Sequence, residues 1–244
     1  MRVVVGALRR FSLLRVSNVY LLDGGSGARW LVDCGHPLER PQLLAELRFS
    51  GLRPSDLSGV LLTHHHSDHA GNAAYLRDRF GLRIFAHEAD ARALEGRGDA
   101  PLRAPSGSTW LESAFLRIEA AFPARTAVDV VLGAGDEAAG LEVHWVPGHT
   151  EGSLFFRHAP TRTLLTGDTI LTAYPPLTVK AGLTLAHPAY ARDLSLAHAS
   201  LVAFHAGGHA YENLLAGHGL PLVGGAREKV LAVMEAAGLD GAAR

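Results

Sequence analysis

Four side chains able to bind a metal ion lie within the six residues from His64 to His69. They are His64, His66, Asp68 and His69, and the apolar run 59–62 comes directly before them. The apolar run is typical of a buried strand, and a helical pattern begins at Ala70. A strand that ends in such a turn presents its side chains from a rigid scaffold. Imidazole and carboxylate together suit zinc or a similar transition metal, so this stretch predicts a metal site, although a His-rich polar loop is the alternative.

Three further residues share one sequence context, because each follows a short apolar run in a turn that contains glycine. They are His149 in Pro-Gly-His-Thr, Asp168 in Thr-Gly-Asp-Thr and His218 in Ala-Gly-His-Gly. Glycine permits a sharp turn and a close backbone approach at such positions. Taken singly, each residue is better explained as a turn or capping residue. Together with the cluster they give seven candidate ligands, which favours a metal site formed by much of the chain.

The rest of the chain alternates between strand-like and helix-like segments. Strands are predicted from apolar runs at 3–5, 11–16, 19–22, 30–32, 59–62, 82–86, 128–132, 141–146, 153–156, 163–165 and 214–215. Helices are predicted at 37–51, 70–80, 88–94, 110–122, 189–205 and 225–237, and 174–188 is expected to be irregular. This alternation is typical of layered α/β folds.

Chain length and composition predict one domain over residues 1–244. The 244 residues, of which 48% are hydrophobic and 19% charged, suffice for a large core, and no linker-like stretch divides them. The segment 96–125 begins with Gly, Pro, Arg and Ser and ends in a helical pattern. We expect it to be an insertion over the active face.

Charge and hydropathy exclude several classes of partner. A formal net charge of -1 gives no electrostatic footprint for nucleic acid or for an anionic membrane. No run reaches the roughly 18–20 apolar residues of a spanning helix, and the N-terminus has no signal-peptide pattern. The single cysteine, Cys34, excludes an internal disulfide framework. We therefore expect a cytoplasmic protein that acts on a small molecule, and its oligomeric state stays open.

The ordered set of His64-x-His66-x-Asp68-His69, then His149, Asp168 and His218, resembles the signature of the metallo-β-lactamase superfamily. Asp33 matches the acidic strand end that precedes the motif, so the resemblance covers nearly the whole chain. The Thr-His-x-His-x-Asp-His cluster is most similar to that of the glyoxalase II-like hydrolases. The resemblance implies an α/β (layered α+β) fold, a four-layer αββα sandwich of two mixed β-sheets flanked by helices.

The resemblance also implies two adjacent divalent metal ions, with zinc expected and iron or manganese as alternatives. His64, His66 and His149 would hold the first ion, Asp68, His69 and His218 the second, and Asp168 would bridge both. Asp68 and Asp168 then count as catalytic residues too. A hydroxide between two metals can attack an ester, thioester or lactone. Asp33 would orient the cluster loop or a ligand histidine, with a turn cap as an equal alternative.

Residues beside the candidate ligands receive weaker predictions. His65 alternates with two ligands and should point away from them, and His144 is expected to be structural. Tyr174 follows Asp168 and could polarise a substrate carbonyl, as a tyrosine does in related lactonases, or could simply pack beside prolines. Lys180 could bind an anion or be a solvated charge.

Other activities of the same superfamily remain open from sequence. The first alternative is a non-haem iron oxidoreductase that resembles persulfide dioxygenases; flavo-diiron proteins have Glu where this chain has His66. A non-catalytic adaptor would have lost ligands, and none is lost. After Asp168 the chain reads Thr169-Ile170-Leu171 where glyoxalase II has a Gly-Cys-Gly-Arg-type stretch, which argues against hydroxyacylglutathione as its substrate.

Overall fold

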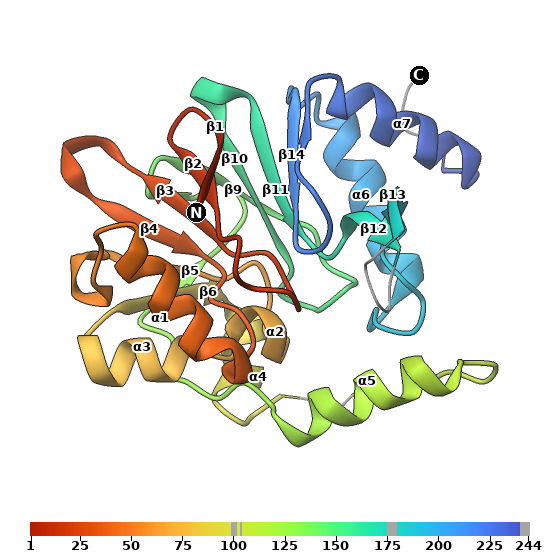
Figure 1. Ribbon diagram of the computed structural model, residues 1–244. Coiled ribbons are helices and arrows are strands. Elements are labelled where there is room, and N and C mark those ends of the chain that lie inside the picture. Colours follow the sequence, from red (N-terminus) through yellow and green to blue (C-terminus); the bar gives the residue numbers. More distant parts are fainter. Residues whose placement is uncertain (99–101, 103, 175–179, 240–244) are drawn as a thin grey trace.

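The computed structural model describes residues 1–98, 102, 104–174 and 180–239. Within these residues the strands form two large sheets and one hairpin (Figure 1). The first sheet runs in chain order: β1 (Arg2–Val5), β2 (Leu8–Arg10), β3 (Tyr20–Asp23), β4 (Arg29–Val32), β5 (Gly59–Leu61), β6 (Arg83–His87) and β7 (Val130–Leu132). Its first four strands pair antiparallel and β4 to β7 pair parallel, so the sheet is mixed.

The second sheet contains the later strands of the chain. Its order is β15 (Leu222–Val223), β14 (Asn213–Ala216), β11 (Thr163–Gly167), β10 (Leu154–His158), β9 (Leu141–Trp145) and β8 (Glu137–Ala138). Only the β11–β14 pair is parallel among these neighbours. A separate hairpin joins β12 (Ile170–Tyr174) and β13 (Lys180–Leu185).

Helices cover the outer faces of the two sheets (Figure 1). The α-helices among the described residues are α1 (Arg40–Phe49), α2 (Ser67–Ala70), α3 (Ala73–Phe80), α4 (Glu88–Leu94), α5 (Trp110–Ala121), α6 (Leu194–Ala206) and α7 (Ala226–Ala236). The helices α1 and α3 pack on the first sheet, and α6 and α7 pack on the second. In this part of the chain no helix has the length and apolar content needed to span a membrane.

Three apolar layers hold the sandwich together, and alternation along single strands shows how. In β10, Phe156 points between the two sheets, whereas Phe155 packs under α6 with Phe204. In β3, Leu22 faces the second sheet and Leu21 faces the helices of the first. Successive strand residues point to opposite faces, so strands buried on both faces read as continuous apolar runs. The predicted four-layer αββα arrangement is confirmed.

Two predicted strand and loop assignments are wrong. Residues 11–16 form a loop, because buried carboxylates of Glu46 and Glu39 take the backbone amides that a neighbouring strand would need. Glu46 accepts from the amides of Ser12 and Leu13, and Glu39 accepts from those of Arg15 and Val16. The segment 174–188, expected to be irregular, contains β13, which pairs with β12; residues 175–179 lie outside the described part.

Two predicted helices have different limits. The helix predicted at 70–80 is divided into α2 and α3, since the Asn72 side chain between them donates to the carbonyls of Cys34, Gly35 and His36. The helix predicted at 189–205 begins only at Leu194. Its N-cap is Asp193, whose carboxylate accepts from the Leu196 amide at 2.9 Å. Side-chain caps of this kind define a helix start.

Candidate metal centre

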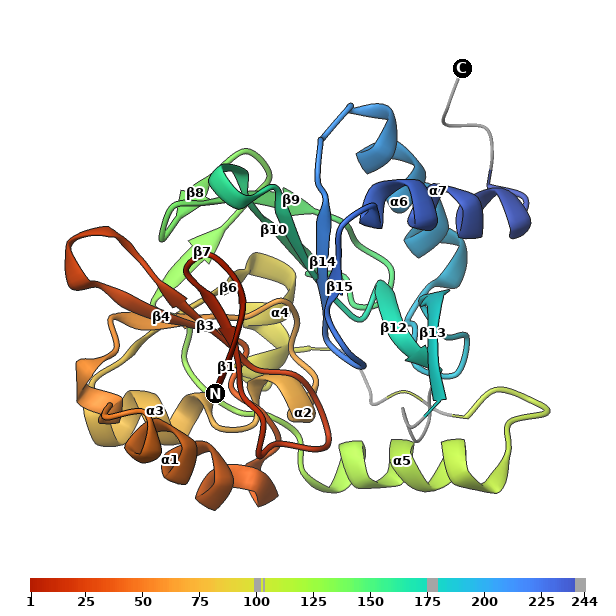
Figure 2. The ribbon, with the colours of Figure 1, turned by 45° about the horizontal axis from the view of Figure 1, so that its top comes forward.

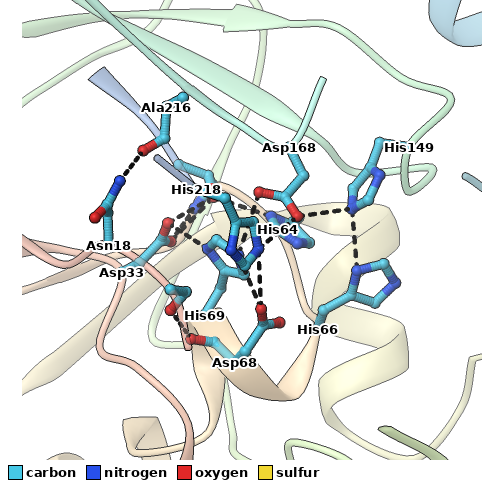
Figure 3. Close-up of polar contacts among 12 residues, drawn as sticks. Asn18, Asp33, His64, His66, Asp68, His69, His149, Asp168, Ala216 and His218 are labelled. Carbon is cyan, nitrogen blue, oxygen red and sulfur yellow. Dashed lines mark hydrogen bonds and ion pairs between the residues drawn. The ribbon is translucent and has the colours of Figure 1, made fainter. Parts of the chain in front are cut away.

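The histidine cluster occupies the turn between β5 and α2. The backbone amide and hydroxyl of Thr63 both donate to the Asp33 carboxylate, each at 2.8 Å, which holds the turn against the end of β4. The carbonyl of His66 then accepts from the amides of His69 and Ala70 and begins α2. This short turn directs His64, His66, Asp68 and His69 to one side, toward the second sheet (Figure 3).

The other three candidate ligands come from the second sheet, each just past a strand end. His149 follows β9, Asp168 follows β11 and His218 follows β14. Glycine is required at two of these turns. A Cβ on Gly148, at φ +128°, would lie 2.1 Å from the Ala197 amide nitrogen, and a Cβ on Gly217 would lie 2.1 Å from a carboxylate oxygen of Asp168. The predicted close backbone approach is therefore present.

All seven predicted ligands meet at the edge where the two sheets face each other (Figure 3). The His149 Nε2 atom lies 3.0 Å from His66 Nδ1. The His218 Nε2 atom lies 3.2 Å from an Asp68 carboxylate oxygen and 3.1 Å from one of Asp168. Asp168 lies between the two groups, because its Oδ1 is 3.4 Å from His69 Nε2 and its Oδ2 is 4.0 Å from His149 Nε2.

These side chains suit metal ions in both geometry and chemistry. Three sets have ligand atoms within 4.8 Å of one another: His64 with His66 and His149, His64 with Asp68 and His69, and His69 with Asp168 and His218. Three buried atoms that point into the cluster, His64 Nε2, His69 Nε2 and Asp168 Oδ1, have no hydrogen-bond partner among the described residues. Buried polar atoms without partners are rare in proteins. Imidazole nitrogen and carboxylate oxygen are the donors that zinc and related metals prefer, so the residues fit two such ions.

The electrostatics divide the cluster into two parts. Burial, with the neighbouring imidazoles, lowers the pKa of His149 to about 3 and of His66 to about 4, and holds the pKa of His64 well below its usual range. These three rings are therefore neutral near pH 7 and offer lone pairs to a cation.

The second part is an ion-paired group. Burial opposes a charge on His218, but the carboxylates of Asp168 and Asp68 outweigh it and raise the pKa of His218 to about 10. Burial likewise opposes a charge on His69, but the carboxylates of Asp68 and Asp168 outweigh it and raise the pKa of His69. In return, these histidines outweigh the effect of burial on the two aspartates and lower their pKa.

Asp33 makes the contact predicted for it. Its carboxylate lies 2.8 Å from His69 Nδ1, which leaves Nε2 of that ring facing Asp168. Asp33 adopts φ +60°, in the left-handed region that few residues other than glycine, Asn and Asp enter. This conformation turns the carboxylate back over the Thr63 turn, so that one side chain holds both the turn and a candidate ligand.

A second buried carboxylate, Asp90 at the start of α4, was not found from sequence. Asp90 is 1% exposed, and its Oδ1 atom lies 3.0 Å from Nδ1 of His65. The His65 ring therefore points away from the candidate ligands, as the alternation of side chains predicts. Asp90 also accepts from the Thr150 hydroxyl and from the Gly152 amide, both at 2.9 Å. It thereby ties the turn that carries His66 to the turn that carries His149.

Helix α5 lies across the open edge of the site, below the β12–β13 hairpin in both ribbon views (Figures 1 and 2). The Glu119 carboxylate accepts from the amide and hydroxyl of Ser67, and Glu112 lies 3.4 Å from His187 Nε2. The sequence predicts that 96–125 is an insertion over the active face. The structure places α5 there, while residues 99–101 and 103 lie outside the described part.

The tyrosine beside the site differs from the one suggested by sequence. Tyr174 is 43% exposed at the end of β12, with the Lys180 ammonium 5.1 Å above its ring. Tyr190 instead lines the cavity next to the ligands, and its buried hydroxyl has no hydrogen-bond partner among the described residues. Burial, with a smaller contribution from Glu112, raises the pKa of Tyr190, so this hydroxyl stays protonated and can donate.

Neither His144 nor Cys34 belongs to a set of candidate ligands. The His144 ring packs against Phe204 and His209, as expected for a structural histidine. The Cys34 thiol is buried and contacts the His69 carbonyl at 3.2 Å. Burial raises its pKa, and a protonated thiol is a poor nucleophile.

Sequence comparison assigns the family. Residues 13–206 match the metallo-beta-lactamase superfamily. The chain belongs to this superfamily. Among curated relatives, the hydroxyacylglutathione hydrolase of Rhodopseudomonas palustris (strain HaA2) is 32% identical over 155 residues, which cover 63% of this chain and 48% of that protein. The probable metallo-hydrolase YflN of Bacillus subtilis (strain 168) is 25% identical over 86% of this chain and 83% of its own.

Solved structures share the same architecture. The metallo-beta-lactamase family protein TTHA1429 from Thermus thermophilus is 25% identical, with a TM-score of 0.65 over 95% of this chain and 79% of its own. TTHA1623, solved in a di-iron-bound form, has a TM-score of 0.63 and 23% identity over 96% of this chain and 97% of its own. The chain spans about half the length of several curated relatives, including the hydroxyacylglutathione hydrolase and the B. subtilis protein YybB.

Proposed function

We propose that this metallo-beta-lactamase superfamily member is a binuclear metal-dependent hydrolase of carboxylic esters, thioesters or lactones. One observation carries the proposal: seven donor side chains converge in three overlapping sets, and Asp168 lies between His69 and His149. Two ions bound there would lower the pKa of a water molecule and polarise a substrate carbonyl. With that chemistry, no side chain of the protein has to serve as the nucleophile.

The chain's own residues prepare the site for this reaction. The neutral rings of His64, His66 and His149 are ready ligands without the loss of a proton. Asp33 orients the His69 ring so that Nε2 faces Asp168, and such a contact raises the affinity of a histidine ligand for a metal. The protonated hydroxyl of Tyr190 is available to donate to an oxygen of the substrate.

For the metal, we propose zinc, because nitrogen and oxygen donors in sets of three imidazoles or mixed His and Asp suit it. Iron and manganese accept similar donors, and the fold neighbour TTHA1623 was solved in a di-iron-bound form. For the substrate, we propose an acyl compound other than hydroxyacylglutathione. The residues after Asp168 form β12, and the match to the hydroxyacylglutathione hydrolases covers about half of those proteins.

The test combines metal analysis with a substrate panel. Purified protein loaded with zinc, manganese or iron should contain two ions per chain and hydrolyse at least one of a thioester, an acyl-homoserine lactone and an aryl ester. Nitrocefin, a bis-phenyl phosphodiester and S-lactoylglutathione serve as the alternative substrates. His149→Ala and Asp168→Ala should abolish turnover, while Trp110→Ala, an exposed change on α5, should not. One iron per chain with consumption of oxygen in the presence of a persulfide would replace the hydrolase by an oxidoreductase.

A further inference from the structure

A cavity of about 360 Å³ opens directly beside the candidate ligands. Asp68, Asp168 and His218 form one end of it, and α5 forms a side wall. This volume lies near the lower end of the range for small-molecule sites, roughly 300–1,000 Å³. A molecule in this cavity would therefore have one end at the metal ligands and the remainder along α5.

Apolar side chains make up much of the wall away from the ligands. Apolar side chains from five separate segments line it: Val16, Leu38, Leu102, Phe115, Leu116, Ile118 and Leu171. Leu116 and Leu171 are buried, whereas Val16, Leu38 and Ile118 are exposed large hydrophobic side chains. Exposed apolar groups that gather at one place, rather than singly, mark a binding surface.

Two polar side chains on these walls, Glu119 and His187, already contact other residues of the protein. The Glu119 carboxylate accepts hydrogen bonds from the amide and hydroxyl of Ser67, and the His187 ring lies against Glu112. A polar substrate group placed along this wall would gain little from them and would lose water. Two polar atoms on the wall have no hydrogen-bond partner among the described residues, the Tyr190 hydroxyl and His36 Nε2. The Arg15 side chain also lines the cavity.

The apolar wall is also held in place before any ligand binds. Glu39, which is buried, accepts from the amides of Arg15 at 2.6 Å and Val16 at 3.2 Å and so anchors the loop that carries Val16. On the opposite side, Glu119 and Glu112 attach α5 at two points along its length. A cavity that is already formed avoids the entropic cost of ordering its walls on binding.

We propose that this cavity binds a linear, uncharged acyl chain, so that the substrate is a medium-chain acyl ester, thioester or lactone. The inference rests on the proposed hydrolase function, because the ligands at its end would act on the acyl carbonyl. The chain would lie against Phe115, Ile118 and Leu171. Each methylene buried there should raise kcat/KM by about fourfold until the cavity is full.

The test is a series of p-nitrophenyl esters that differ only in acyl length: acetyl, butanoyl, hexanoyl, octanoyl and dodecanoyl. Zinc-loaded wild-type protein should prefer hexanoyl or octanoyl to acetyl by at least about tenfold in kcat/KM. Ile118→Trp places an indole ring in the cavity and reduces the space for a long acyl chain. The ratio of octanoyl to acetyl kcat/KM should therefore fall by about tenfold or more. Arg117→Trp adds the same ring at the next, exposed position of α5, outside the cavity, and should leave the ratio unchanged.

Binding measurements separate this inference from the hydrolase function. Calorimetry measures the affinities of octanoate and butanoate, which carry the same carboxylate and differ by four methylene groups. The contribution of the metal contact therefore cancels in the ratio of the two affinities. Octanoate should bind at least about tenfold tighter, and Val16→Trp on the opposite wall should remove most of this difference. Hydrolysis of every ester at the same kcat/KM would overturn the acyl site and leave the hydrolase standing. If no ester, thioester or lactone is hydrolysed, the hydrolase proposal fails. A preference for octanoate would then still support the acyl site, and equal affinities for the two carboxylates would overturn it.

Discussion

The Nδ1 atom of His69 lies 2.8 Å from the carboxylate of Asp33, and the same carboxylate binds the Thr63 turn. One buried acid of the first sheet therefore fixes both the candidate ligand and the start of the cluster. Because Asp33 adopts φ +60°, Asp33→Asn is the change that best preserves the backbone.

Asp33→Asn should weaken zinc binding by about 10- to 100-fold, the usual cost of losing such a partner of a histidine ligand. Competition with a chromophoric chelator measures the affinity. Asp23→Asn is the matched control, since Asp23 ends β3 and pairs with Arg9 and Arg29 on the surface. Equal zinc affinity in Asp33→Asn and wild type would show that the contact does not orient His69.

Asp90→Ala should lower the free energy of unfolding by about 3–5 kcal/mol, because it leaves His65, Thr150 and Gly152 without their buried acceptor. Urea denaturation at pH 7 measures the change. Asp78→Ala, at an exposed position, should stay within about 0.5 kcal/mol of wild type. A loss no larger than in this control would contradict the role of Asp90 in joining the two ligand turns.

The seven candidate ligands were predictable because each has a local signature, either the dense cluster or a glycine turn after an apolar run. The layers were predictable for a similar reason, since strands such as β10 are apolar on both faces. Asp90 has no such signature: its partners Thr150 and Gly152 are 60 and 62 residues away, and Glu119 is 52 residues from Ser67. Pairings at such separation depend on the packing of whole elements.

The position of Tyr190 could not be predicted for the same reason. Closeness to Asp168 along the chain favours Tyr174, but β12 continues into the hairpin with β13 and places the Tyr174 ring under Lys180. Tyr190 reaches the cavity from the segment after that hairpin. The strand β13 was missed because its Lys180-Ala181-Gly182 start lacks apolar alternation; a Cβ on Gly182 would lie 2.0 Å from the Tyr174 ring.

Tyr190→Phe should reduce kcat/KM for the best ester by about tenfold, the usual worth of one hydrogen bond to a substrate in a site that excludes water. Tyr174→Phe, which removes a hydroxyl outside the cavity, should keep the wild-type value. Steady-state kinetics of both variants at several acyl lengths check this. If Tyr190→Phe matched Tyr174→Phe in kcat/KM, the Tyr190 hydroxyl would not contact the substrate.

Glu46→Gln should lower the free energy of unfolding near pH 7 by about 2 kcal/mol, because a buried charge-assisted acceptor is lost. Burial alone raises the pKa of Glu46, but the amino group of Met1 at 2.6 Å and the amides of Leu13 and Ser12 outweigh it and lower the pKa. A lowered folded-state pKa means that the stabilisation is complete above the unfolded-state pKa, about 4.3, and is lost as the pH falls through the folded-state pKa.

Urea denaturation of wild type and Glu46→Gln at a series of pH values checks this linkage. The gap in free energy of unfolding between the two proteins should be constant from about pH 7 to 5 and narrower below about pH 4. A gap that widened toward acid pH would reverse the sign of this linkage and exclude a stabilising Glu46 carboxylate.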